Sequence, residues 1–156
     1  LIKLLFFVCI FFYIAQPDYI ITRRLYFIMD KVKVELEYII NTSPNILFNC
    51  LTTPSGLSEW FADDVNLKDD YFTFFWDGSE ETAKYINVKK GNSVRFQWEE
   101  DEEEGNDYYF EMAIKIDDLT KEVALIITDF AEEDEVDEAK LLWDNNISKL
   151  KQAIGG

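Results

Sequence analysis

Alternation of apolar and polar residues predicts a strand from Lys31 to Ile40. Every second residue from Val32 to Tyr38 is apolar, and the residues between them are charged. A period of two places the apolar side chains on one face of a half-buried strand. One face of this strand should therefore pack on a core while the other meets solvent.

Two short helices are expected after this strand. Ser43 and Thr53 each precede a proline, which provides a side-chain cap followed by a residue with a helical φ angle. The expected apolar sides carry Ile46, Leu47, Cys50 and Leu51 in the first helix, and Leu57, Trp60 and Phe61 in the second.

Five further segments have the pattern of strands, namely 72–76, 81–88, 93–99, 107–117 and 122–130. Turn residues such as Asp77-Gly78 leave short connections, so we expect an antiparallel meander. The last segment is almost continuously apolar, which is typical of a strand covered on both faces. The stretch with Asp63-Asp64 and Asp69-Asp70 is expected to be a loop, and the acidic run 99–104 a solvated hairpin.

A long amphipathic helix is expected at the end of the chain. Asp134 can cap it, its first turn is acidic, and Lys149 and Lys151 lie before Gly155-Gly156, as the helix dipole favours. Its apolar positions step by three and four residues and form one stripe: Val136, Ala139, Trp143, Ile147, Leu150 and Ile154. A sheet with one apolar face and a helix with one apolar stripe predict an α+β domain in which the two pack together.

Composition excludes several functions. The 156 residues carry a net charge of -16, which repels nucleic acid and anionic lipid, so we expect neither a nucleic-acid partner nor stable membrane association. The chain has no histidine, which removes Ser-His-Asp and Cys-His catalysis. No glycine-rich phosphate loop is present, and we expect no cofactor and no metal site. Cys50 is expected to be a buried small apolar residue.

Residues 1–29 differ from the rest of the chain, because the first fifteen are apolar except for Lys3. We expect this segment to come from translation of upstream DNA, with Met29 as the start and a cytoplasmic protein as the result. One alternative is a signal peptide or a membrane anchor, which would make the protein secreted or anchored, and another is a genuine folded element. The functional prediction depends on residues 30–156.

A family resemblance rests on the two short helices. Segment 43–54, SPNILFNCLTTP, followed by LSEWF at 57–61, resembles the signature of START-like proteins, the SRPBCC superfamily. More narrowly it resembles the branch of bacterial homologues of the activator of the heat-shock-protein-90 ATPase, whose closing helix is similar to 142–151 here. The six consecutive acids at 99–104 depart from that pattern. The resemblance implies the helix-grip fold, in which a curved antiparallel sheet packs on a long C-terminal helix.

The resemblance also implies a cavity between sheet and helix that holds an apolar or amphipathic small molecule, with the two short helices as its lid. The residues expected to line it are Trp60, Phe74, Trp76, Phe96, Trp98, Phe110, Met112, Trp143 and Ile147. The same side chains can equally fill the space as a packed core. Arg95 should face solvent, but in the opposite register it would anchor a carboxylate-bearing ligand.

Two other functions stay open. The domain could be a chaperone-partner module whose acidic surface contacts a basic protein, with binding that weakens in salt. It could also be a cyclase-type enzyme, which would need a buried carboxylate or tyrosine with a shifted pKa. No pair of residues stands out as catalytic, so a non-catalytic binding domain is the prediction.

Overall fold

Seven antiparallel strands form one sheet in the computed structural model, which describes residues 31–155. The predictions for residues 1–29 lie outside this range. The strand order is β1-β7-β6-β5-β4-β3-β2, so every strand after the first lies beside its neighbour in sequence, as a meander requires. The strands are β1 (Val32–Ile40), β2 (Asp64–Lys68), β3 (Tyr71–Trp76), β4 (Ser79–Lys89), β5 (Ser93–Trp98), β6 (Phe110–Ile116) and β7 (Val123–Ala131).

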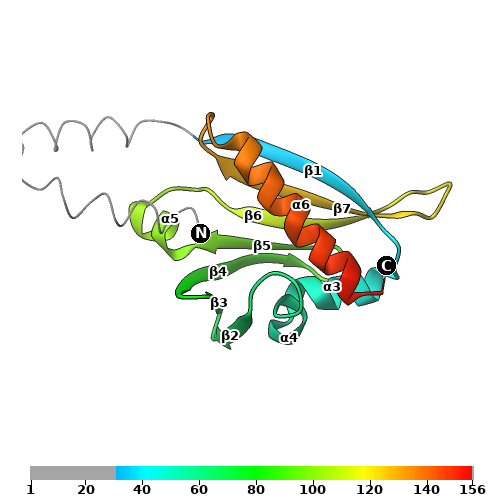
Figure 1. Cartoon of the computed structure of the whole chain (residues 1–156), viewed down its shortest axis with the longest axis horizontal. Coiled ribbons are helices and arrows are strands. Elements are labelled where there is room, and N and C mark those ends of the chain that lie inside the picture. The colour runs from blue at the N-terminus through cyan, green and yellow to red at the C-terminus, as the bar shows by residue number, and fades with distance from the viewer. Residues whose placement is uncertain (1–30, 156) are drawn as a thin grey trace, which may run out of the picture. The chain divides into compact units, whose positions relative to one another are not determined.

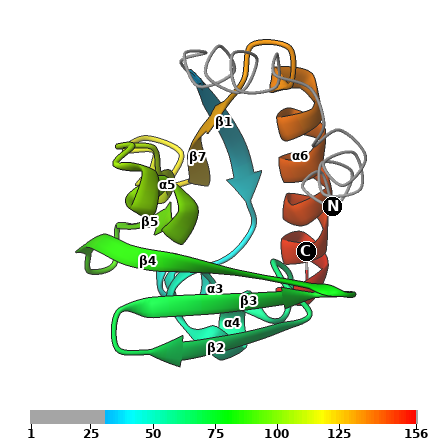
Figure 2. The same cartoon turned by 90° about the vertical axis from the view of Figure 1, so that its left-hand side faces the viewer.

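One long helix, α6 (Val136–Ala153), runs diagonally across the sheet (Figure 1). The sheet bends strongly, so that β2, β3 and β4 run across the direction of β1 and β7 (Figure 2). Helices α3 (Pro44–Thr52) and α4 (Pro54–Leu57) follow β1, with α3 against β5 and β6 and α4 against β2. This is the predicted α+β helix-grip architecture.

The strand register gathers the apolar side chains on the face that α6 covers. Leu36 pairs with Ile127, and Ile127 pairs with Met112, so one row of side chains crosses three strands on the same side. Met112, Ile127 and their inward neighbours are buried. Neighbouring β7 residues are buried on both faces, as its continuous apolar pattern predicts.

The expected caps hold the two short helices in place. The Ser43 hydroxyl accepts a hydrogen bond from the Ile46 N–H at 3.3 Å, and the Thr53 hydroxyl accepts one from the Gly56 N–H at 3.0 Å. Leu47, Cys50 and Leu51 are buried on the apolar side of α3. Ile46 is half exposed, so its assignment to that side was wrong.

The stretch expected to be a loop after the second short helix contains strand β2. It pairs with β3 at the edge of the sheet, and Val65 is its only buried residue. Asp64 is the first residue of the strand, whereas Asp69 and Asp70 form the turn to β3. An edge strand of five residues with one buried side chain leaves little apolar alternation to detect.

The run of six acids forms a short helix, α5 (Glu99–Glu104), and the prediction of a solvated hairpin was wrong. Gly105 ends it in the left-handed conformation, with φ of 74°. Glu102 pairs with Lys84 of β4 and accepts a hydrogen bond from the Tyr71 hydroxyl at 3.1 Å, while Asp101 is buried. Acidic residues favour the first turn of a helix, and here one side of that turn is fastened to the sheet.

Helix α6 begins one residue later than expected. Its N-cap is Glu135, not Asp134, and the Glu135 side chain accepts no hydrogen bond from the backbone N–H groups of the first turn. Trp143, Ile147 and Leu150 are buried, which confirms the centre of the predicted apolar stripe.

The close packing of α3 and α4 gives a stability prediction at Gly56. A Cβ atom there would lie 2.5 Å from the Asn49 carbonyl oxygen and 2.7 Å from the Cys50 Cα atom. We expect Gly56→Ala to lower the free energy of unfolding by about 1–3 kcal/mol, because backbone atoms must move to make room. Urea unfolding followed by circular dichroism measures this. Ser55→Ala is the control, since Ser55 is exposed, and equal midpoints for the two variants would contradict the close approach.

Candidate functional site

Aromatic rings from the sheet and α6 form one cluster on the inner face. Phe96 stacks on Phe110 with ring centroids 5.0 Å apart, and Trp98 lies 5.0 Å from Phe110. Phe74 contacts Phe96 at 6.1 Å, and Phe110 lies 6.2 Å from Trp143 of α6. Six of the predicted lining residues therefore meet in space, the sixth being Trp76, 6.0 Å from Phe74.

Phe61 occupies the centre of this cluster and bridges sheet and helix. Its ring stacks on Phe110 at 5.8 Å and on Trp143 at 5.9 Å, and it meets the edge of Phe74 at 5.1 Å. It also contacts Trp76 at 6.0 Å, and its side chain is almost completely buried. Phe61 is the one of these rings that comes from the turn after α4 rather than from a strand or α6. The sequence pattern predicted Phe61 on the apolar side of the second short helix. It did not indicate that the ring lies between the sheet and α6.

The remaining predicted residues belong to the same core. Trp60 joins the cluster through Phe61, with ring centroids 5.4 Å apart. Met112 and Ile147 are buried in the same apolar cluster. The structure thus brings all nine predicted residues into one apolar region, and their role in binding stays a prediction.

Three tryptophans use the indole N–H to fix neighbouring elements. Trp60 donates to the Cys50 carbonyl at 3.1 Å, which ties the turn after α4 to the end of α3. Trp76 donates to the Phe61 carbonyl at 2.9 Å and so holds the backbone of the bridging residue. Trp143 donates to the Asp129 carboxylate at 2.7 Å. A buried tryptophan combines a large apolar area with one polar group that needs a partner.

Asp129 and Tyr38 make the polar contacts between the sheet and α6. Asp129 lies on the inner face of β7, where its register partner is Val34. The Tyr38 hydroxyl of β1 donates to the Asp144 carboxylate at 2.7 Å. Burial, together with this hydrogen bond, raises the pKa of Tyr38 far above its usual value. The sequence pattern placed Tyr38 on the apolar face, but its bond to the helix carries no sequence signal.

The register places Arg95 on the outer face, away from α6. Its guanidinium binds the Glu111 carboxylate at 2.6 Å and lies 3.9 Å above the centre of the Tyr109 ring. Arg95 therefore does not face the space between sheet and helix, and it cannot anchor a carboxylate there. Lysine and arginine are absent from the inward-facing strand positions whose side chains the structure describes.

Cys50 and Tyr85 are the other groups of residues 31–155 in which burial is the main cause of a raised pKa. Burial raises the pKa of the Cys50 thiol, which keeps it protonated and unreactive. Burial also raises the pKa of Tyr85 in β4. In residues 31–155 no three Cys, Asp or Glu side chains come together in a way that could hold a metal ion.

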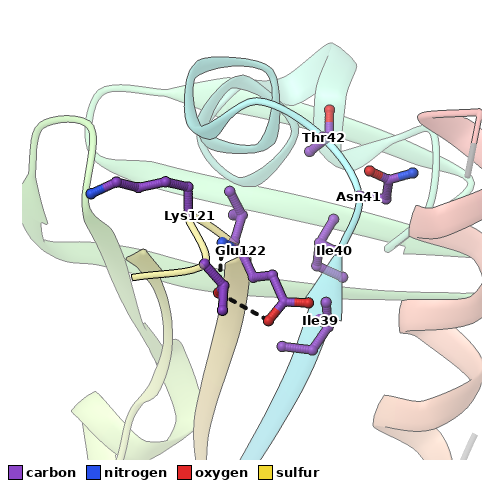
Figure 3. Close-up of a pocket in the computed structure, with 8 residues that line it drawn as sticks. Ile39, Ile40, Asn41, Thr42, Lys121 and Glu122 are labelled. Carbon is purple, nitrogen blue, oxygen red and sulfur yellow. Dashed lines mark hydrogen bonds between the residues drawn. The ribbon is translucent and has the colours of Figure 1, made fainter. Parts of the chain in front are cut away.

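A pocket of about 400 Å³ lies elsewhere, where β1 leads into α3 beside the turn between β6 and β7 (Figure 3). Thr120 and Glu122 shape one side, because the Thr120 hydroxyl donates to the Glu122 carboxylate at 3.1 Å. Its lining contains none of the predicted residues and consists of Ile39, Ile40, Asn41, Thr42, Thr120, Lys121, Glu122 and Val123.

The sheet, α6 and the two short helices have counterparts in known proteins. A family model for the START-like superfamily domain matches residues 28–156. The chain belongs to the START-like superfamily.

Solved structures agree with this START-like assignment. A Bacteroides fragilis protein is 41% identical, with a TM-score of 0.59, over 82% of this chain and 94% of that one. The Aha1 dimer from Colwellia psychrerythraea is 18% identical, with a TM-score of 0.67, over 79% and 96% of the two chains. An AHSA1-like protein from Aeromonas hydrophila is 11% identical, with a TM-score of 0.64, over 79% and 92%. The Colwellia and Aeromonas proteins share the fold of this chain, and their names belong to the branch that the sequence resembles.

No curated protein matches the sequence of this START-like chain. Across residues 31–155, none of the helices has the length and apolar character needed to cross a membrane.

The bond between Tyr38 and Asp144 predicts a pH-dependent contribution to stability. We expect Tyr38→Phe to lower the free energy of unfolding by about 1 kcal/mol at neutral pH, because it removes the donor of one hydrogen bond. A raised pKa in the folded state means that this contribution is complete below about pH 10, the usual tyrosine pKa. It is lost as pH rises further, since the unfolded state then releases the proton first.

Urea unfolding of both proteins between pH 7 and pH 11 measures this difference. The advantage of the wild type over Tyr38→Phe should shrink above about pH 10. Tyr109→Phe is the control, because the Tyr109 hydroxyl makes no hydrogen bond to any residue that the structure describes. A constant advantage across the whole range would contradict the role given to the Tyr38 hydroxyl.

Proposed function

We propose that this START-like domain binds an apolar or amphipathic small molecule between the sheet and α6, without catalysing a reaction. The observation that carries the proposal is the continuous aromatic surface of the inner face, from Phe74 to Trp143, with Phe61, a ring supplied by a turn, at its centre. Ligand sites in proteins are mostly apolar and aromatic, with few polar groups. The inward-facing positions fit that description.

The ligand would take the place of the Phe61 ring. The strands and α6 hold Phe74, Phe110 and Trp143, whereas Phe61 lies in a turn and its backbone carbonyl accepts a hydrogen bond from the Trp76 indole. A rotation of the Phe61 side chain would leave a space bounded by Phe74, Phe110 and Trp143, without breaking that bond. The turn after α4 would then act as the lid that the resemblance to START-like proteins implies.

A non-catalytic role fits the chemistry of the inner face. Raised pKa values keep Tyr38 and Tyr85 protonated at neutral pH, so neither serves as a base. Asp129 is committed to the Trp143 indole. We therefore place ligand burial, rather than a cyclase-type reaction, at the centre of the proposal.

Mass spectrometry of the protein purified from its own organism tests the proposal directly. We expect the native mass to exceed the denatured mass by an amount of the order of a few hundred daltons, typical of small-molecule ligands. Equal masses in preparations that retain their fold would count against a filled site.

A variant at the bridging ring tests where the ligand lies. We expect Phe61→Ala to bind naphthalene more tightly than the wild type, because the apolar space no longer has to be vacated by a ring. The variant should also lose about 3–5 kcal/mol of stability, as core truncations do. Phe130→Ala is the matched control, since Phe130 lies on the outer face of β7. Equal naphthalene affinity in the wild type and Phe61→Ala would place the ligand elsewhere.

A second candidate function rests on helix α5. Its attachment through Glu102 to Lys84 and Tyr71 fixes the helix on the sheet, while Glu99, Glu103 and Glu104 are exposed. A fixed row of carboxylates would suit a basic surface on a protein partner such as a chaperone. The Aha1-like neighbours have the same fold, which makes this partner class worth testing.

Charge reversal separates the two functions. We expect Glu99→Lys with Glu103→Lys to abolish pull-down of a basic partner and to leave naphthalene binding unchanged, because the helix lies outside the aromatic cluster. Glu133→Lys with Asp134→Lys is the matched control in another exposed acidic segment. A partner retained by the first variant as well as by the second would rule out α5 as its binding surface.

A further inference from the structure

Asn146 is a polar residue in the apolar stripe of α6. It is 8% exposed, and in the helix it lies between Trp143 and Leu150, which are both buried. Its neighbour Asn145 has the same side chain but is exposed. The buried position of Asn146 therefore needs a physical reason.

The Asn146 side-chain amide makes no hydrogen bond to any of residues 31–155. Burying such a group without a partner costs free energy, and unsatisfied buried groups are rare in folded proteins. Among residues 31–155 no fully enclosed side-chain nitrogen or oxygen lacks a partner. Each polar atom of the Asn146 amide therefore has some surface that water can reach, although most of the residue is covered.

The helix geometry shows which flank of α6 carries this amide. Successive residues are about 100° apart around a helix, so Asp144 and Asn146 lie on opposite flanks of Trp143. Asp144 faces β1, because Tyr38 donates to it. Asn146 therefore lies on the flank away from β1, about 60° from the direction of Trp143. The ring of Trp143 is the one on which Phe61 stacks.

We propose that Asn146 is the polar anchor of the ligand site. This inference rests on the proposed function and adds the ligand's chemical class, which is an uncharged molecule with an apolar body and one hydroxyl or carbonyl group. An amide can both donate and accept a hydrogen bond, so it fits either group.

Charge supports an uncharged ligand. The inward-facing strand positions with described side chains offer no lysine or arginine to a carboxylate. Asp129 lies on the same inner face, and the whole chain carries a net charge of -16. An anionic head group would thus meet repulsion and find no ion-pair partner on these strand positions.

A matched pair of probes tests the anchor. 2-Naphthol and naphthalene have the same apolar body, and only the first carries a hydroxyl. We expect the wild type to bind 2-naphthol about tenfold more tightly than naphthalene at pH 7, the effect of roughly one good hydrogen bond. Isothermal titration calorimetry with the full chain measures both affinities.

Asn146→Leu should remove this preference and leave naphthalene affinity equal or higher. Asn145→Leu is the control and should keep the preference. Because Leu at position 146 could disturb packing, Asn146→Ala is measured as well, and urea unfolding verifies that each variant folds. Loss of the preference in both Asn146 variants, with Asn145→Leu unchanged, would support the anchor.

The outcomes separate the anchor from the proposed function. A tenfold preference that persists in Asn146→Leu or Asn146→Ala would overturn the anchor and leave the binding function intact. Equal affinity of the wild type for 2-naphthol and naphthalene would also overturn the anchor and leave the binding function intact. Failure of both probes to bind the wild type and Phe61→Ala would overturn the binding function itself, and the anchor with it.

Discussion

The strand register is the constraint on which the rest of the structure depends. Because side chains alternate along each strand, a shift by one residue would turn the apolar set of that strand toward solvent. The observed pairing aligns Phe96 with Phe110 and Met112 with Ile127, so that one continuous apolar surface faces α6. The aromatic cluster, the buried stripe of the helix and the outward position of Arg95 all follow from that alignment.

Within this frame, hydrogen bonds select one arrangement from the many that apolar packing allows. The indole N–H groups of Trp60, Trp76 and Trp143 each bind one acceptor on a different element. Apolar contact alone tolerates small shifts, whereas a directed bond in a low-dielectric interior does not. The tryptophans therefore set the position of the turn after α4 and of α6 relative to the sheet.

Much of this fold could be predicted from the sequence, because its strongest patterns are local. The alternation of β1, the two capped prolines and the stripe of α6 each lie within one segment. The errors arose where local signals were weak or misleading. Strand β2 has one buried residue, and the acids of α5 were interpreted by charge alone, although acidic residues also favour a first helical turn.

The site was harder to predict, since it depends on contacts between distant segments. Alternation identified the rings that face inward, yet it could not show that Phe61 lies among them or that Asp129 binds Trp143. The open amide of Asn146 was equally invisible, because an asparagine within an amphipathic helix reveals neither its depth nor its partners. Such features emerge only when the sheet and α6 are packed together.

The pairing of β1 with β7 has a consequence for how the protein acquires its structure. The two strands join residues that are far apart in the chain, from Ile40 opposite Val123 to Val32 opposite Ala131. During synthesis β1 leaves the ribosome long before β7 has been made. The apolar face of β1 therefore stays uncovered during that time, whereas β2 to β6 can pair with strands that are close in sequence. Contacts of such high sequence separation slow folding. The chain is therefore most prone to aggregate while the sheet is incomplete. A chaperone would protect it most at that stage.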